Sequence, residues 1–217
     1  RRARIRPEVP TGGHVRLLDP DEAIETLPRL YERLGPYRPG VITRPHAWWT
    51  VQCERPLRTG EHLVVVVHSG DDGDDGFAVY QSERRMGPDG VDSPLLRVED
   101  FHADSAAAVA GLWRFLLTID LIDEVWVRIR PTDEPLEAML VDPRACRTEL
   151  VGDDLWLRLV DVPAALAARA YGRAAPVVIE VVDRFLPVNS RRYLIGPDGA
   201  TPTSHPAQLA LDVDALA

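Results

Sequence analysis

Histidine, serine and aspartate are the residue types through which this chain could do metal or hydrolytic chemistry, and their spacing supports neither. The six histidines form no His-x-x-x-His or His-x-x-His pair, and no Gly-x-Ser-x-Gly segment surrounds a serine. The aspartate-rich segment 71–76 invites a calcium-loop interpretation, but Gly73 and Ser82 stand where such a loop needs ligands. Because Asp-Gly pairs suit tight turns, a solvated turn is the better interpretation. We therefore predict no metal site and no hydrolytic triad.

Two adjacent tryptophans, Trp48 and Trp49, are the other residues that could contact a ligand. They fall on a short predicted helix, where neighbouring side chains cannot both face one core, so we expect one of them to be exposed. Packing against the next element is the favoured interpretation. The wall of a ligand pocket is the alternative, since an exposed indole offers a flat apolar face.

The composition is that of an ordinary globular chain, with 217 residues, 45% of them hydrophobic and 27% charged. All 25 basic residues are arginine, and the formal charge of −9 argues against nucleic acid or an anionic membrane as the main partner. A cationic ligand suits this charge. No apolar run approaches the ~18 residues of a membrane span, and we expect no signal peptide. Cys53 and Cys146 lack metal-ligand spacing, which favours a reducing compartment, the cytoplasm.

Hydrophobic periodicity and helix caps predict an alternating series of strands and helices up to residue 160. A helix over 20–34 follows Asp19, with Pro28 expected to kink or shorten it, and a longer core helix begins at a capping Asp104. The predicted strands are 14–18, 63–67, 77–80, 95–101, 125–129, 146–151 and 155–160, and the other helices are 45–53 and 134–140. The segment 63–67 is a continuous β-branched run, which indicates a strand covered on both faces.

This order, β-α-α-β-β-β-α-β-α-β-β, resembles the GCN5-related N-acetyltransferase (GNAT) fold, an α/β (α+β) fold with a mixed sheet flanked by helices. The resemblance implies that acyl-CoA would place its pyrophosphate on backbone amides between the fourth strand and the long helix, in a loop that needs glycines. Here residues 98–110 contain no glycine and carry Glu99, Asp100 and Asp104. We therefore predict a GNAT-like domain without a cofactor site.

The remaining residues predict a second, smaller α+β unit. A helix over 162–171 precedes strands at 177–182, 193–195 and 209–213, with a turn at 196–199. The small core and open sheet edge indicate an incomplete domain, and we expect the chain to be cut at both ends. The predicted organisation is the end of a missing N-terminal GNAT domain with its linker at 1–13, a central GNAT-like domain at 14–160, and a partial third domain at 161–217.

The residues also resemble a particular family, the enhanced intracellular survival (Eis) N-acetyltransferases of actinobacteria. The matching stretches are Leu30–Arg33, Arg44-Pro45 followed by Trp49, Gly76–Tyr80, Leu112–Arg114 with Asp120, Asp133–Leu136, Asp142–Arg144, and above all Leu155–Arg158 running into Asp161–Tyr171. The family has an N-terminal GNAT domain that holds acetyl-CoA, a central GNAT-like domain without cofactor, and a C-terminal domain similar to sterol carrier proteins. The resemblance implies that this chain covers the central domain and the opening of an incomplete sterol-carrier-like α+β domain.

By the same resemblance, the acetyl-CoA loop, the tyrosine general acid and the chain-terminal general base lie outside this sequence, so no catalytic or cofactor-binding residue is expected within it. The family's central domain supplies a wall of an acidic pocket that takes polycationic amines such as aminoglycosides. Trp49 resembles a pocket-lining tryptophan of the family and Asp153 a pocket aspartate, whereas Val51 replaces an expected acidic residue. For Asp153, a plain turn aspartate remains an equal alternative.

Two functional hypotheses follow. In the first, the chain is part of an acetyl-CoA-dependent N-acetyltransferase of polycationic amines, inactive in isolation, which the resemblance implies to be a homo-oligomer, a hexamer. In the second, it is a non-catalytic scaffold or apolar-ligand-binding protein with a degenerate GNAT domain.

Overall fold

The computed structural model describes residues 3–10, 12–35, 40–86, 90, 92–153 and 155–216. Contacts divide the chain into two compact units, Arg1–Leu150 and Val151–Ala217, and each is described by itself. The boundary at residue 160 stays a prediction. Residues 36–39, which lie between the predicted helices 20–34 and 45–53, are outside the described residues.

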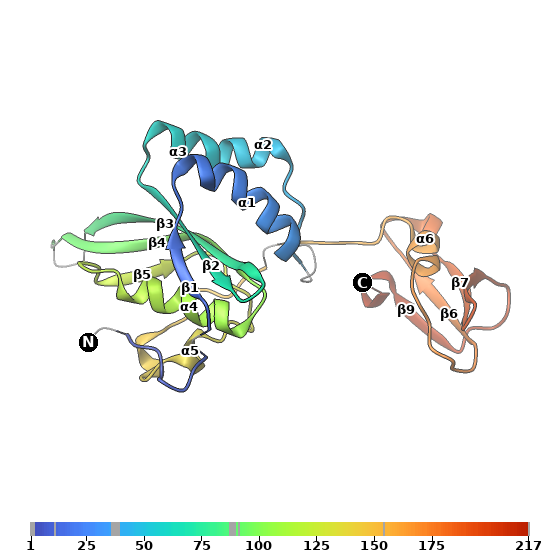
Figure 1. Cartoon of the computed structure of the whole chain (residues 1–217). Helices are drawn as coiled ribbons and strands as arrows, with labels where there is room; N and C mark the ends of the chain where they lie inside the picture. The colour runs from blue at the N-terminus through green and yellow to red at the C-terminus, as the bar shows by residue number, and fades with distance from the viewer. Residues whose placement is uncertain are drawn as a thin grey trace. The chain divides into compact units, whose positions relative to one another are not determined.

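The first unit is built on a five-stranded mixed sheet (Figure 1). Its strands are β1 (His14–Leu17), β2 (Leu63–Gly70), β3 (Gly73–Met86), β4 (Asp92–Ala103) and β5 (Glu124–Val127), in that spatial order. The first four are antiparallel neighbours, and β5 lies parallel to β4 because helix α4 (Ala106–Thr118) crosses between them. The mixed sheet flanked by helices confirms the predicted fold class.

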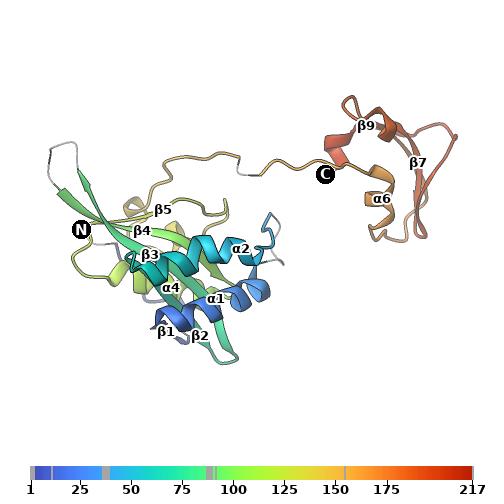
Figure 2. The same ribbon diagram turned by 90° about the horizontal axis from the view of Figure 1, so that it is seen from above.

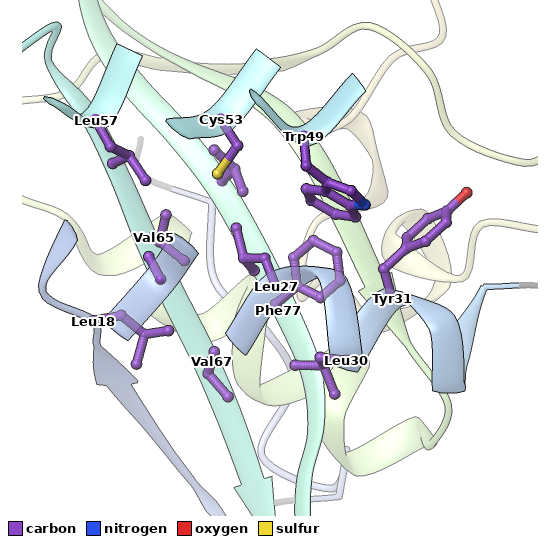
Figure 3. Close-up of a cluster of buried hydrophobic side chains, with 12 residues drawn as sticks. Leu18, Leu27, Leu30, Tyr31, Trp49, Cys53, Leu57, Val65, Val67 and Phe77 are labelled. Atoms are coloured by element: carbon purple, nitrogen blue, oxygen red, sulfur yellow. The ribbon is translucent and has the colours of Figure 1, made fainter. Parts of the chain in front are cut away.

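Helices cover both faces of this sheet, and the alternation along β2 shows why its sequence is continuously apolar. Val65 and Val67 belong to a core shared with α1 (Pro20–Leu34) and the helical segment 46–59, whereas Val66 belongs to a second core beneath α4. Figure 1 shows α1 to α3 on one face and α4 on the other, and Figure 3 shows the first core, with Leu27 and Leu30 of α1 directed at the sheet. The prediction of a strand covered on both faces is confirmed.

Two helix details differ from the prediction. Helix α1 continues through Pro28 to Leu34, so the proline does not shorten it. Helix α4 is capped by Ser105, whose hydroxyl accepts a hydrogen bond from Ala108 N at 3.0 Å, and the predicted cap Asp104 lies one residue too early. Asp104 instead directly follows the last residue of β4, and its N–H donates to Asp75 O at 3.1 Å. Both residue types can cap a helix, and here the side chain of Ser105 does so.

The segment after helix α5 (Leu136–Met139) and the 3₁₀ turn η2 (Pro143–Ala145) departs most from the prediction. No described residue of 146–160 is in a strand, and Trp156 is 83% exposed. Apolar composition predicts burial, but a strand also needs a partner for its backbone groups, and the pattern does not specify one. The predicted strands 146–151 and 155–160 are therefore wrong.

The second unit has a four-stranded sheet of order β8-β7-β6-β9, with helix α6 (Val162–Ala167) packed against it. Its strands are β6 (Val177–Val182), β7 (Arg191–Gly196), β8 (Gly199–Pro202) and β9 (Leu209–Asp212). A 3₁₀ turn, η3 (Pro187–Asn189), lies between β6 and β7, and another, η4 (Val213–Leu216), follows β9. The predicted turn at 196–199 joins β7 to β8, a strand that the sequence pattern missed. Figure 2 shows α6 beside β7 and β9 in this unit.

Candidate functional site

A cavity of about 320 Å³ opens in the first unit between α1 and the helical segment that carries the two tryptophans. We call it the α1–η1 pocket. Its walls come from α1, from α2 (His46–Trp49) and from the π-helix η1 (Thr50–Glu54), which continues into α3 (Arg55–Thr59). The lining residues are Ile24, Pro28, Tyr31, Glu32, Thr43, Arg44, His46, Trp49, Thr50, Cys53 and Glu54.

The sequence places aromatic side chains at the base of this pocket. Trp49 is only 8% exposed and packs with Tyr31, their ring centroids 5.6 Å apart in an edge-to-face arrangement. Figure 3 shows Trp49 and Cys53 reaching down from the 46–59 segment toward the sheet, opposite Tyr31 of α1. Trp48 is half-buried and contacts Trp49, so the expectation of one exposed tryptophan is wrong.

The guanidinium group of Arg44 packs against the aromatic rings of Tyr31, Trp48 and Trp49. Its guanidinium carbon lies 3.9 Å from the Tyr31 ring centroid and 4.0 Å from that of Trp48, and 5.2 Å from Trp49. Arg44 therefore already occupies the faces of Tyr31 and Trp48 that a ligand cation could use.

Asp100 neutralises this arginine from β4. Arg44 Nη1 donates to Asp100 Oδ2 and Nη2 to Oδ1 at 3.1 Å, while His102 Nε2 lies 2.9 Å from Oδ1. Burial by itself would raise the pKa of Asp100, but the hydrogen bonds from His102 and Arg44 outweigh it and lower the pKa to about 2. The Arg44–Asp100 pair is thus a closed, bidentate ion pair next to the pocket.

The pocket wall contains a buried thiol, that of Cys53. Cys53 is 5% exposed, and burial together with the nearby Asp100 and Glu54 carboxylates raises its pKa to about 11. Since the thiolate is the reactive form, Cys53 is an apolar wall residue at neutral pH.

The other residue predicted to bind substrate, Asp153, lies in the second compact unit, on an exposed stretch without regular secondary structure. Its neighbour in the predicted turn, Asp154, lies outside the described residues. Trp49 lines the α1–η1 pocket of the first unit. Contact of either side chain with substrate stays a prediction.

The junction of β4 and α4, where the GNAT resemblance would place a pyrophosphate, is filled by the chain itself. Asp75 Oδ2 accepts a hydrogen bond from the capping hydroxyl of Ser105 at 2.9 Å, and its Oδ1 lies 2.5 Å from His68 Nδ1. His68 is 1% exposed, with Nε2 2.9 Å from the carbonyl oxygen of Gly12. A carboxylate of the protein therefore already lies beside the helix N-terminus, where an anion is attracted.

Sequence reasoning missed the Arg44–Asp100–His102 network. A signal was present, because Asp100 and His102 stand two residues apart in a strand and so share one face. Their arginine partner is 56 residues earlier in the chain, which spacing alone does not connect. Among the described residues, no group of three or more His, Cys, Asp and Glu side chains could hold a metal ion.

A family model described as an acetyltransferase (GNAT) domain matches residues 40–159, more than half of the chain. The chain belongs to this family. A model of the sterol carrier protein domain matches residues 162–217. The chain is 33% identical to N-acetyltransferase Eis of Mycobacterium tuberculosis, over 99% of this chain and 52% of that protein. It is 37% identical to an uncharacterized N-acetyltransferase of Streptomyces coelicolor, over 99% and 54%.

Among solved structures, Eis1 from Mycobacterium abscessus matches with a TM-score of 0.78 and 35% identity, over 99% of this chain and 53% of that one. The predicted resemblance to the Eis N-acetyltransferases is confirmed. A GCN5-related N-acetyltransferase from Anabaena variabilis shares the fold, with a TM-score of 0.68 at 24% identity. The chain spans about half the length of the curated relatives it matches. Within the part of the chain that the structure describes, no helix is long and apolar enough to cross a membrane.

Proposed function

We propose that this chain is part of an acetyl-CoA-dependent N-acetyltransferase of polycationic amines such as aminoglycosides, and that it supplies a wall of the amine pocket and an assembly surface. The family membership and the relatives named as N-acetyltransferases support the chemistry. The observation that carries the assignment of roles is the contrast within the first unit. The α1–η1 pocket is open and acidic at its rim, whereas the β4–α4 junction is occupied by Asp75.

In the proposed reaction an unprotonated substrate amine attacks the thioester carbonyl of acetyl-CoA, the C–N bond forms and the C–S bond breaks. A positioned base takes the amine proton, and an acid protonates the leaving thiolate. We assign this acid, this base and the acetyl-CoA site to parts of the complete protein outside this chain. The chain's own contributions are Trp49, an apolar wall, and Asp153, an exposed carboxylate that attracts an ammonium group.

We further propose that the complete protein is a cytoplasmic homo-oligomer, a hexamer. The exposed apolar run that includes Leu155, Trp156 and Leu157 supports an assembly surface, because single chains rarely leave so many neighbouring apolar side chains in water. The same run is the observation that favours the second candidate function, a non-catalytic scaffold.

Two measurements decide between these candidates. The complete protein should release CoA when given acetyl-CoA and an aminoglycoside or polyamine, and Asp153→Asn in it should raise KM more than it lowers kcat. The 217-residue chain should bind no acetyl-CoA in calorimetry. Absence of CoA release with every amine tested, in a folded complete protein, would favour the scaffold. Micromolar acetyl-CoA binding to the 217-residue chain would contradict the proposed division of roles.

A further inference from the structure

We infer that the α1–η1 pocket holds one ring of the substrate together with the primary ammonium group that this ring carries. The ammonium group would donate hydrogen bonds to the carbonyl of Ile24 and the carboxylates of Glu32 and Glu54. The inference rests on the proposed function, in that it names the part of the amine that this pocket holds. It places the ammonium at the rim between two helices and leaves the Trp49 face to the apolar part of the ring.

Pro28 supplies the first acceptor. It lies in the interior of α1 and has no N–H, so the carbonyl of Ile24, four residues earlier, lacks its helical donor. Both residues line the pocket. A backbone carbonyl without a donor is costly to bury and needs water or a ligand donor. At this wall, α1 therefore offers an acceptor that an uninterrupted helix would keep for itself.

The facing wall is equally unusual. Residues Thr50–Glu54 form a π-helix, in which Arg55 N donates to Thr50 O, and three of its five residues line the pocket. Such widened turns are rare and recur at functional sites. This one directs Thr50 and Glu54 to the same opening as Ile24 and Pro28.

The charges at the pocket select a cation. Its one lining arginine, Arg44, is neutralised by Asp100, which leaves the carboxylates of Glu32 and Glu54 to set the sign at the rim. Glu32 is exposed, and the structure assigns it no ion pair with a described residue. Glu54 shares one oxygen with Arg58, at 3.1 Å, and keeps the other. An anionic ligand would face hydrogen-bond acceptors and negative charge on both walls and would be repelled.

The pocket volume and lining select one ring. About 320 Å³ lies at the lower end of small-molecule sites and suits a single substituted six-membered ring. Ile24, Pro28 and Trp49 give that ring apolar contact, while Tyr31 directs its hydroxyl away to Ile42 O at 2.6 Å. The remainder of a polycationic amine would stay outside this pocket.

The test uses benzylamine and its neutral counterpart benzyl alcohol with the 217-residue chain, in calorimetry and amide NMR at neutral pH, where the amine is protonated. We expect the amine to bind about tenfold more tightly than the alcohol, because the ammonium donates charge-assisted hydrogen bonds. Glu32→Gln should weaken amine binding about threefold, and less so at high salt. Glu25→Gln, an exposed carboxylate on α1 that does not line the pocket, is the matched control and should leave binding unchanged.

Pro28→Ala is the sharper variant. It restores the N–H that bonds the Ile24 carbonyl, so it should weaken amine binding severalfold while leaving Tm unchanged or higher. Equal binding of amine and alcohol, no amine binding at millimolar concentration, or full affinity in both Pro28→Ala and Glu32→Gln would overturn the inference. CoA release by the complete protein decides the proposed function separately. If the complete protein transfers acetyl groups but the α1–η1 pocket does not bind amines, only this inference is refuted. If the pocket binds amines but the complete protein releases no CoA, only the proposed function is refuted.

Discussion

The α1–η1 pocket and the β4–α4 junction are two polar sites in one unit, and they differ in where their hydrogen bonds go. At the junction, Asp75 meets Ser105 and His68, and both ring nitrogens of His68 face oxygen atoms. Gly13 and Gly111 complete this packing, since a Cβ on either would lie within 2.7 Å of a His68 ring atom. At the pocket, acceptors of α1 and η1 open to solvent.

The difference separates structural polarity from binding polarity. Buried polar groups that satisfy one another rigidify a fold and leave nothing for a ligand. Polar groups that lack a partner within the protein and lie beside an apolar wall can bind a ligand. At the junction, the Asp75 carboxylate is held by Ser105 and His68 of the same chain.

The largest expected effect comes from breaking the junction. Asp75→Ala removes the partner of a histidine that is 1% exposed and of the Ser105 hydroxyl, so the first unit should lose about 3 kcal/mol in its free energy of unfolding. Urea denaturation measures this. Asp72→Ala, an exposed turn aspartate of the same hairpin, is the control and should cost under about 0.5 kcal/mol. Similar small losses in both variants would mean that the junction is not a closed network.

The pocket side is sharpened by pH. The pKa of Asp100 is lowered to about 2 in the folded chain, against about 3.9 for an unperturbed aspartate. A lowered folded pKa contributes stability that is present above pH 4 and is lost as pH falls through 2. The loss should be about 2 kcal/mol, on an order-of-magnitude basis, since the side chain is 15% exposed.

Denaturant titrations from pH 5 to pH 2 measure it, followed by tryptophan fluorescence in a Trp156→Phe background, where all four remaining tryptophans lie in the first unit. Asp100→Asn should be less stable at pH 5 and should show a flatter acid limb. Asp183 provides a control in the second unit, because its pKa is also about 2. Burial would raise this pKa, but hydrogen bonds from Asn189, the Leu186 N–H and Arg158 outweigh the effect of burial. In the same background, Asp183→Asn should leave the acid response of the first unit's tryptophan fluorescence unchanged. An unaltered acid limb in Asp100→Asn would refute the assignment.

The sequence predicted the elements that a local pattern of residues defines, and it missed contacts between residues far apart in the chain. The valine run of β2 and the apolar stripe of α4 carry their own periodicity, so strand and core helix were predictable. The Arg44–Asp100 pair joins residues 56 positions apart, and no local pattern encodes it. The failure at 146–160 has the opposite cause. Its apolar residues have the composition of strands, but strand pairing also requires a partner strand, which the composition of the segment does not specify.

The smallest effect concerns the helix cap, where sequence and structure disagree by one residue. Ser105 accepts from Ala108 N and donates to Asp75, whereas the carboxylate of Asp104 makes one exposed ion pair with Arg33 at 3.7 Å. Ser105→Ala should therefore cost about 1 kcal/mol, and Asp104→Ala less than about 0.5 kcal/mol. Since Ser105 and Asp75 share a hydrogen bond, the double variant with Asp75→Ala should lose less than the sum of the two single losses. Strict additivity would mean that Ser105 serves only α4, and the Asp75 carboxylate would then be held by His68 alone.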